Sequence, residues 1–304
     1  MSDLVLTDVS RWYGNVVAVN DVNMHIGPGI TGLLGPNGAG KSTLLSMMAG
    51  LLPPSSGTVT IDGEPTRGNI RIYRRIGLVP VQESLYDFLT GEQFVRLNAD
   101  LQRVPQPAKA TEWAIGLVEM SDAAGRKIST YSKGMKQRIK VASALVHDPG
   151  ILLLDEPFNG MDPIQRRHMM GLLTRFAEQG RTIVFSSHIL EEVEQIARQV
   201  EVVVAGRHAA SGDFAAIRRL MTDRPNQYVV RSSDDRALAA LLLADASVRG
   251  ARLRGGTALE VEADDFGRFA ALVPRVAQQN DIRIFELTPT DESLESVFSY
   301  LVNQ

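Results

Sequence analysis

The stretch that decides the fold reads Tyr131-Ser132-Lys133-Gly134-Met135-Lys136-Gln137-Arg138, then Ile151-Leu152-Leu153-Leu154-Asp155-Glu156, then Gly160-Met161-Asp162-Pro163. A serine–glycine turn opens a helix, and a short apolar strand then ends in two carboxylates. Short, apolar, β-branched strands are typical of a buried parallel sheet. An open parallel sheet has its ligand site at the carboxyl ends of its strands. We therefore expect an α/β protein with its chemistry at Asp155 and Glu156.

A glycine-rich loop lies upstream and fits the phosphate-binding pattern G-x-x-x-x-G-K-[ST]; it reads Gly35-Pro36-Asn37-Gly38-Ala39-Gly40-Lys41-Ser42-Thr43. An apolar strand at 30–34 precedes the loop, and a helix at 41–52 follows it. Main-chain N–H groups and a helix N-terminus bind phosphates. We expect the whole loop to hold a nucleotide, with Lys41 at the β- and γ-phosphates, Ser42 on Mg²⁺ and Thr43 at another phosphate.

Composition excludes several classes of function. The net charge of −3 gives no electrostatic footprint for nucleic acid. The chain has no cysteine, so it forms no disulfide framework and no thiolate zinc site. Its start lacks a basic and apolar signal segment, and no apolar run approaches the roughly 20 residues that a spanning helix needs. If the protein works at a membrane, we expect it to do so from the cytoplasmic side, through a partner.

The length of 304 residues suits two domains. Residues 1–222 read as an α/β nucleotide-binding core with strands at 4–9 and 17–26, and a helical insertion at about 85–146 that is broken near Pro105 and Pro107. The segment from Thr222 to Asn226 reads as a linker.

Residues 223–304 read as a small α+β accessory domain. The expected elements are a strand at 227–231, a helix at 234–243, strands at 247–254 and 258–262, a helix at 265–279 and a strand at 282–287. This is the strand–helix–strand–strand–helix–strand order of a ferredoxin-like domain, with Gly255-Gly256 as a hairpin turn. A final helix carries Leu294, Val297, Phe298 and Leu301 on one face.

The order of these motifs resembles the ATP-binding subunit of an ATP-binding-cassette (ABC) transporter over roughly residues 1–220. The resemblance implies that ATP and Mg²⁺ are the cofactors and that the core is a P-loop NTPase of ABC type. It also implies that Asp155 holds Mg²⁺, that Glu156 orients the attacking water, and that His188 contacts the γ-phosphate. Asp162 resembles the aspartate that communicates across a dimer, and Tyr13 lies where the family places the aromatic ring that stacks on adenine.

In this family the signature motif of one protomer closes over the γ-phosphate bound by its partner, which gives a head-to-tail homodimer when ATP is bound. Ser132 and Gly134 match its serine and second glycine. Lys133 and Met135 replace the first glycine and the glutamine of the usual Leu-Ser-Gly-Gly-Gln. The Ser-Lys-Gly-Met form resembles a variant that is frequent among ABC-2 type drug and antibiotic exporter ATPases.

The loop after Pro80 departs from the family pattern, which has a glutamine directly after the proline. Counting along the chain puts Val81 in that position, whereas matching by chemistry selects Gln82. A valine cannot ligate Mg²⁺ or report the γ-phosphate. Either the backbone is shifted by one residue, or the link between nucleotide and permease is weakened. We expect Gln82 to be the nucleotide and Mg²⁺ contact.

The resulting hypothesis is an ATPase subunit that powers an ABC-2 type exporter. Its partner is a separate membrane permease, which holds the ATPase at the inner face of the cell membrane. A non-transport ABC ATPase acting on ribosomes or DNA is an alternative, but the single cassette and the lack of a basic patch argue against it. A regulatory module that senses nucleotide is a third, supported only by the unusual loop at Val81.

Overall fold

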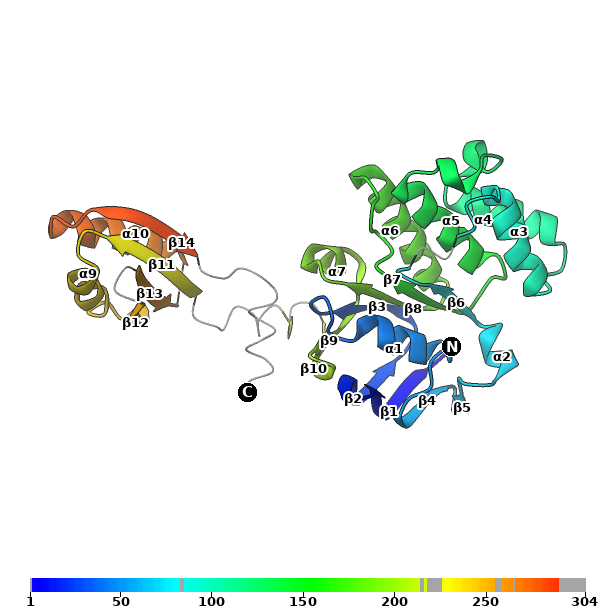
Figure 1. Ribbon diagram of the computed structural model, residues 1–304, viewed down its shortest axis with the longest axis horizontal. Helices are drawn as coiled ribbons and strands as arrows, with labels where there is room; N and C mark the ends of the chain where they lie inside the picture. The colour runs from blue at the N-terminus through cyan, green and yellow to red at the C-terminus, as the bar shows by residue number, and fades with distance from the viewer. Residues whose placement is uncertain are drawn as a thin grey trace. The chain divides into compact units, whose positions relative to one another are not determined.

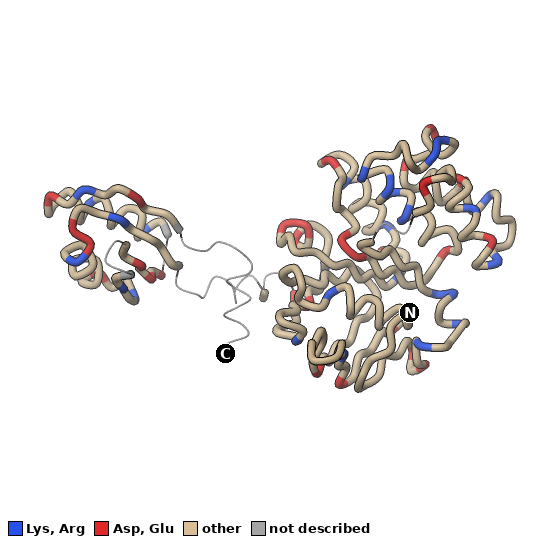
Figure 2. The backbone as a smooth tube through the Cα atoms, viewed as in Figure 1, with Lys and Arg blue, Asp and Glu red and all other residues tan. Residues whose placement is uncertain are grey.

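The computed structural model describes residues 2–82, 85–213, 216–217, 226–254, 258–264 and 266–289, which divide into two compact units at residues 214–215 (Figure 1). The predicted boundary between residues 222 and 223 lies outside the described residues. Basic and acidic residues are interspersed along both units (Figure 2). Within the described ranges, no helix combines the length and the apolar character that crossing a membrane requires.

The first unit contains two sheets. A six-stranded sheet has the order β10-β9-β3-β8-β7-β6. Five of these strands are parallel, and β10 is antiparallel to β9. Their bounds are β3 Gly29–Leu34, β6 Ile76–Val79, β7 Ile151–Asp155, β8 Thr182–Ser187, β9 Gln199–Val204 and β10 Arg207–Gly212. The apolar strands β7 and β8 are buried along their whole length, as expected for a parallel sheet covered on both faces.

An antiparallel sheet of order β2-β1-β4-β5 lies beside it. Its strands are β1 Leu4–Tyr13, β2 Val16–Ile26, β4 Ser56–Ile61 and β5 Glu64–Pro65. Helix α1 (Lys41–Met48) contributes Leu44, Leu45, Met47 and Met48 to a single core that includes residues of both sheets. The apolar side chains of α1 therefore join the two sheets around the residues that follow the glycine-rich loop.

The predicted helix at 41–52 ends earlier than expected. Its last helical residue is Met48, and Gly50 adopts a left-handed φ of 72°. A Cβ at Gly50 would lie 2.7 Å from the carbonyl oxygen of Thr66, so only glycine fits this turn. Glycine just after a helix is a common stop, and it takes effect here before the prolines at 53 and 54.

The remaining helices of the first unit include the predicted helical insertion. It contains α3 Gly91–Leu101, α4 Pro107–Leu117 and α5 Lys133–Leu145, with short 3₁₀ turns at Ser121–Ala123 and Ile128–Thr130. Outside the insertion are α2 Ile70–Tyr73, α6 Pro163–Glu178 and α7 Leu190–Ile196. The break predicted near Pro105 and Pro107 separates α3 from α4.

The second unit has an antiparallel four-stranded sheet of order β12-β13-β11-β14. Its elements are β11 Asn226–Ser232, α9 Asp235–Leu242, β12 Val248–Arg254, β13 Ala258–Ala263, α10 Phe266–Gln279 and β14 Ile284–Pro289. Each lies within two residues of its predicted bounds. Leu238 and Leu242 of α9 and Phe269 and Val273 of α10 pack with the buried side chains of the sheet. The predicted turn at Gly255-Gly256 and the predicted helix carrying Leu294, Val297, Phe298 and Leu301 lie outside the described residues.

Candidate functional site

The glycine-rich loop connects β3 to α1 and is shaped by close backbone packing. A Cβ at Gly35 would overlap the carbonyl oxygen of Val203 on the neighbouring strand β9. Gly40 has a left-handed φ of 103°, and a Cβ there would lie 2.6 Å from the carbonyl oxygen of Ala18. Glycine at these two positions lets the loop lie against β2 and β9, and α1 starts directly after it at Lys41.

Lys41 is buried, and its Nζ donates to the carbonyl oxygens of Gly35 at 2.6 Å and Pro36 at 3.0 Å. Burial lowers the pKa of this amine, while the nearby Glu156 and Asp155 carboxylates act in the opposite direction. The Lys41 side chain therefore hydrogen-bonds back to the start of its own loop and lies close to Asp155 and Glu156, the two carboxylates identified from the sequence.

These groups surround a cavity of about 330 Å³, a size within the usual range for small-molecule sites. Its lining residues are Ala18, Asn37, Gly38, Ala39, Gly40, Lys41, Ser42, Thr43, Val81, Asp155 and Glu156. The structure thus brings most of the predicted loop together with both predicted carboxylates. Ala18 was not predicted to contact nucleotide, and Val81 was the alternative to Gln82 for the position after Pro80. Ala18 lies on β2, and its place beside the loop depends on how the β1–β2 hairpin folds. No local sequence pattern marks it.

Asp155 ends β7 and is buried, and its Oδ1 accepts a hydrogen bond from Ser186 Oγ at 2.6 Å. The same Oγ accepts from the main-chain N–H of Glu156 at 2.9 Å. Ser186, at the end of the adjacent strand β8, thereby orients both carboxylate residues. Sequence reasoning missed this role, although its position just before Ser187-His188 was a usable signal.

Glu156 and His188 lie together, as two residues acting on one water would need to. His188 Nδ1 is 2.9 Å from Glu156 Oε1. Glu156 has a left-handed φ of 49°, which is uncommon for a residue with a Cβ and recurs at functional sites. The turn that aims its carboxylate is thus held in an unfavourable backbone conformation by its surroundings.

A second polar network begins at Ser187, the residue before His188. Ser187 Oγ donates to Glu192 Oε2 at 2.7 Å, and Glu192 Oε1 is 3.3 Å from Arg166 Nη1. Burial raises the pKa of Glu192, opposed by the hydrogen bond from Ser187 and by the Arg166 charge. Arg166 belongs to α6, whose N-cap is Asp162. This network connects the start of α7 to α6, and the sequence analysis did not anticipate it.

The donors in the cavity suit Mg²⁺. A serine hydroxyl and a carboxylate are hard oxygen ligands, and Mg²⁺ usually takes only one or two protein ligands, with water and phosphate oxygens completing its shell. Ser42 and Asp155 both line the cavity. Within the described ranges no cluster of three or more His, Cys, Asp or Glu residues could hold a metal alone. The serine and carboxylate donors thus fit Mg²⁺ bound together with phosphate oxygens.

Gln82 does not line this cavity, whereas Val81 does. The main-chain oxygen of Gln82 accepts from Lys140 Nζ at 3.4 Å, and its side chain is exposed. The geometry thus favours the count along the chain, with Val81 in the position expected to face the nucleotide.

Tyr13 lies at the end of β1, with 47% of its surface exposed, and does not line the cavity. The Arg11 guanidinium lies 4.7 Å from the centre of its ring. One ring face is thus in contact with a cation, a favourable arrangement for a tyrosine. The exposure leaves ring surface on which a base could stack.

Ser132, Gly134 and Asp162 also lie away from the cavity. Ser132 Oγ caps α5 by accepting from Met135 N at 3.2 Å, and Asp162 caps α6 by accepting from the N–H groups at 164 and 165. A Cβ at Gly134 would lie 2.9 Å from the carbonyl oxygen of Gly160. The serine–glycine turn and the Gly160–Asp162 turn therefore pack together, outside the phosphate site of their own chain.

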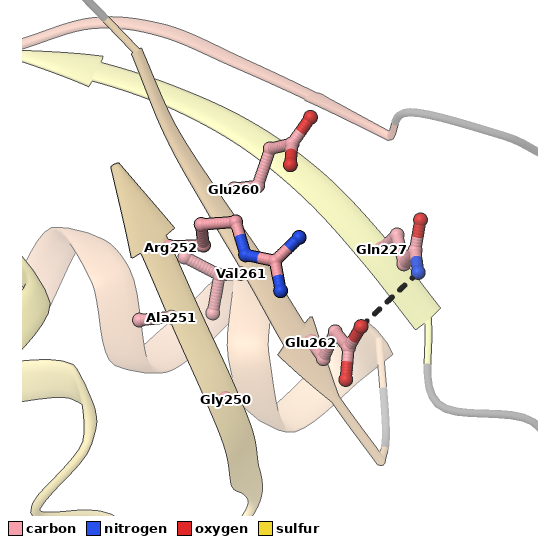
Figure 3. Close-up of a pocket in the computed structure, with 7 residues that line it drawn as sticks. All are labelled: Gln227, Gly250, Ala251, Arg252, Glu260, Val261 and Glu262. Carbon is pink, nitrogen blue, oxygen red and sulfur yellow. Dashed lines mark hydrogen bonds between the residues drawn. The ribbon is translucent and has the colours of Figure 1, made fainter. Parts of the chain in front are cut away.

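The second unit contains a hollow of about 410 Å³ on the face of its sheet opposite the buried core residues. In Figure 3 the Arg252 side chain extends between Glu260 and Glu262, and Gln227 donates to Glu262 at 3.2 Å. This hollow is larger than the cavity at the glycine-rich loop. It is a poorer candidate for nucleotide binding because it has two carboxylates and neither a phosphate loop nor a helix N-terminus among its lining residues.

Comparison with known proteins gives a consistent result. The family described as "ABC transporter" matches residues 19–159. The chain is 32% identical to the bacitracin transport ATP-binding protein BcrA of Enterococcus faecalis, over 97% of this chain and 94% of that protein. It is 29% identical to the linearmycin resistance ATP-binding protein LnrL of Bacillus subtilis, over 98% and 97%.

A solved structure extends the likeness to the fold. It is the dimeric, post-hydrolysis state of an ATP-binding cassette bound to ADP and Pi. This chain matches it with a TM-score of 0.65 and 26% identity, over 69% of this chain and 98% of that one.

Proposed function

Because the chain belongs to the family of ABC transporter ATP-binding proteins and is an ATPase, we propose that it powers an ABC-2 type exporter whose membrane-spanning part is a separate permease. The observation that carries the proposal is the cavity at the glycine-rich loop, where Lys41, Ser42, Asp155 and Glu156 converge and His188 contacts Glu156. In this proposal the ATPase is cytoplasmic and is held at the inner face of the cell membrane by the permease.

The proposed roles combine this geometry with the chemistry of each residue type. Residues 35–43 bind the phosphates of ATP, through main-chain N–H groups and the Lys41 amine. Ser42 and Asp155 would hold Mg²⁺, which would neutralise charge on the phosphates. Glu156 accepts a proton from the attacking water or orients it, and His188 keeps the carboxylate in place. Tyr13 stacks on the base.

Ser132, Gly134 and Asp162 act on the nucleotide of a second copy. Their position away from the cavity of their own chain supports this assignment, as does the dimeric cassette among the similar structures. ATP would then close a head-to-tail homodimer, and hydrolysis would open it. Closure and opening supply the movement that a permease needs.

A groove beside α3 and α5 is the proposed docking site for a short helix of the permease. It has a volume of about 220 Å³, and its lining residues are Ala49, Leu51, Tyr73, Ile76, Leu78, Asn98, Gln102, Ser143, Ala144 and His147. Leu51 is 70% exposed at its rim. A groove lined by both apolar and polar residues suits an amphipathic helix, which could pack its apolar face against Leu51, Ile76 and Leu78.

The direction of transport is proposed from the relatives. Their names speak of bacitracin transport and linearmycin resistance, which supports export of a compound of that kind. The compound itself would be selected by the permease.

The second unit is proposed to be a ferredoxin-like accessory domain. Its element order and its antiparallel strand order β12-β13-β11-β14 support this assignment. Its role would be to stabilise the dimer, contact the permease or regulate turnover.

The test is sedimentation of a Glu156→Gln variant with and without Mg-ATP. We expect a shift from monomer to dimer on adding Mg-ATP, because binding survives when the group that orients water is lost. The shift should disappear in Glu156→Gln combined with Ser132→Ala. A variant that binds ATP and stays monomeric would contradict the dimer mechanism.

A nucleotide-sensing module is the second candidate, and the position of Val81 in the cavity favours it. A sensor would bind ATP with scarcely any turnover. Steady-state ATP hydrolysis by the purified, unsubstituted protein separates the two: sustained turnover contradicts the sensor.

A further inference from the structure

Lys140 is a buried lysine on α5, only 5% exposed. An amine withdrawn from water needs hydrogen-bond acceptors, because losing its hydration without them is costly. Its Nζ donates to the carbonyl oxygen of Pro80 at 2.9 Å and to that of Gln82 at 3.4 Å. These two oxygens lie on either side of Val81, and Val81 lines the nucleotide cavity.

The same helix contacts the other wall of the cavity. Gln137, three residues before Lys140 and so on the same side of α5, donates from Nε2 to the carbonyl oxygen of Glu156 at 3.3 Å. One face of α5 thus reaches the ends of two neighbouring strands, β6 through Lys140 and β7 through Gln137. Both strands deliver residues that line the cavity.

The strand before Val81 is fastened to the same region at its other end. His147, just after α5, is 3.1 Å through Nε2 from the carbonyl oxygen of Ile76, the first residue of β6. Residues of α5 and the residue two positions after it thus contact the main chain at both ends of β6. These contacts offer a direct route from Val81 to the helix.

The N-terminus of α5 is where this displacement would matter. Ser132 caps the helix just over two turns before Lys140, a distance of about 12 Å along the axis. Val81 has no polar side-chain atom, so a link from the cavity to α5 at this point runs through the two flanking carbonyl groups. Lys140 is the residue that holds them.

We propose that Lys140 is a positioning residue: its amine ties the main chain around Val81 to α5, so that ATP in the cavity moves or stiffens the helix that begins at Ser132. The proposal rests on the proposed function. It assigns to Lys140 the coupling between the chain's own nucleotide and the turn that meets the partner's nucleotide.

The test uses backbone amide exchange on the full chain carrying Glu156→Gln, with and without Mg-ATP, at a concentration where it is monomeric. We expect Mg-ATP to slow exchange at residues 35–43 and in α5. Adding Lys140→Met, which keeps the length but removes the donor, should reduce the α5 effect at least tenfold and leave the effect at 35–43 unchanged. Lys140→Arg should retain the α5 effect, and so should Lys109→Met, an exposed control on α4.

The proposal would be overturned if Mg-ATP slowed amide exchange in α5 equally with Lys140 and with Lys140→Met. It would also be overturned if Mg-ATP left amide exchange in α5 of the parent chain unchanged. If Lys140→Met and Lys140→Arg lost the ATP effect on α5 equally, Lys140 would act only through packing, and this result would also overturn the proposal. If residues 35–43 are not protected in the parent, the proposed function itself fails and the coupling falls with it. Should Lys140→Met not fold, Lys140→Gln is measured in its place, because its amide is too short to reach both carbonyls.

Steady-state kinetics provide a second readout without the Glu156→Gln change. Lys140→Met should lower kcat at least tenfold while KM for ATP stays within threefold, and Lys140→Arg should restore much of kcat. A parallel rise in KM would mean that Lys140 shapes the nucleotide cavity itself, which contradicts the coupling role.

Discussion

The six-stranded sheet of the first unit and the four-stranded sheet of the second unit arrange their polar side chains in different ways. In the first unit the ends of β3 and β7 bring Lys41, Asp155 and Glu156 around one cavity, and His188, which follows β8, contacts Glu156. In the second unit, charged residues such as Arg252, Glu260 and Glu262 lie side by side on a sheet face (Figure 3). Both places contain carboxylates and a cation. The first also has buried partners that fix each group, and such preorganisation makes charges useful for catalysis.

The largest difference is expected between two glutamates. Glu156→Gln should lower ATP turnover by at least about a thousandfold, because it removes the group that orients or deprotonates water. Glu262→Gln, the same change on the second sheet, should leave turnover within twofold. Both variants are measured by phosphate release with excess Mg-ATP. A comparable loss in both would mean that the second unit takes part in the chemistry.

Two glycines give the next comparison. Gly35→Ala forces a Cβ against the main chain of Val203, whereas Gly250→Ala puts a Cβ 3.7 Å from the flexible end of Glu262. Overpacking against backbone costs about 1–3 kcal/mol, so Gly35→Ala should unfold at lower denaturant concentration and bind ATP at least tenfold more weakly. Gly250→Ala should match the parent in both measurements. Wild-type ATP affinity in Gly35→Ala would show that the loop tolerates displacement.

The third comparison is between a buried ion pair of the first unit and an exposed ion pair of the second. Glu192 is buried between Ser187 and Arg166, whereas the Glu286–Arg231 pair of the second unit is exposed and 3.8 Å long. Glu192→Gln should lower kcat about tenfold with KM for ATP nearly unchanged, because the strand end that carries His188 loses a charged anchor. Glu286→Gln should change neither, since exposed pairs contribute about 0–1 kcal/mol. An unchanged kcat in Glu192→Gln would separate this network from catalysis.

The smallest effect concerns pH. All five histidines lie at or before His208, so the second unit has none. Burial lowers the pKa of His147 below its ordinary value of 6.5. The unfolded chain therefore takes up a proton first, and stability should fall as the pH drops below about 6.5, by at most about 1.4 kcal/mol per pH unit.

His147→Gln should flatten this slope in denaturant titrations between pH 5.5 and 7.5. A second unit that unfolds separately should show no such slope from histidine. An unchanged slope in His147→Gln would assign the pH dependence to other groups.

Local patterns made much of this protein predictable. The apolar stretch 151–155, the glycine-rich loop and the alternating strands of the second unit each encode their structure within a few residues, so their positions follow from the sequence. The grouping of Asp155, Glu156 and the loop around one cavity was expected too, because parallel strands place their carboxyl ends at one edge.

What escaped prediction depends on residues distant in sequence. The role of Ser186 requires knowing that β8 lies beside β7, and the Arg166–Glu192 pair requires the packing of α6 against α7. From the sequence, Lys140 looks like an ordinary surface lysine. Its contact with the end of β6 becomes visible only in the structure. Gln82 was chosen by its chemistry, whereas the residue that lines the cavity is Val81, which counting along the chain selects.

The left-handed backbone of Glu156 has a further consequence. A residue with a Cβ at φ 49° gives up conformational free energy that glycine or asparagine would not. The chain would therefore be more stable with a residue that cannot do the chemistry. Selection or engineering for heat resistance alone would favour replacement of Glu156 and so would erode activity, which means that thermostability and turnover should be followed together in any set of variants.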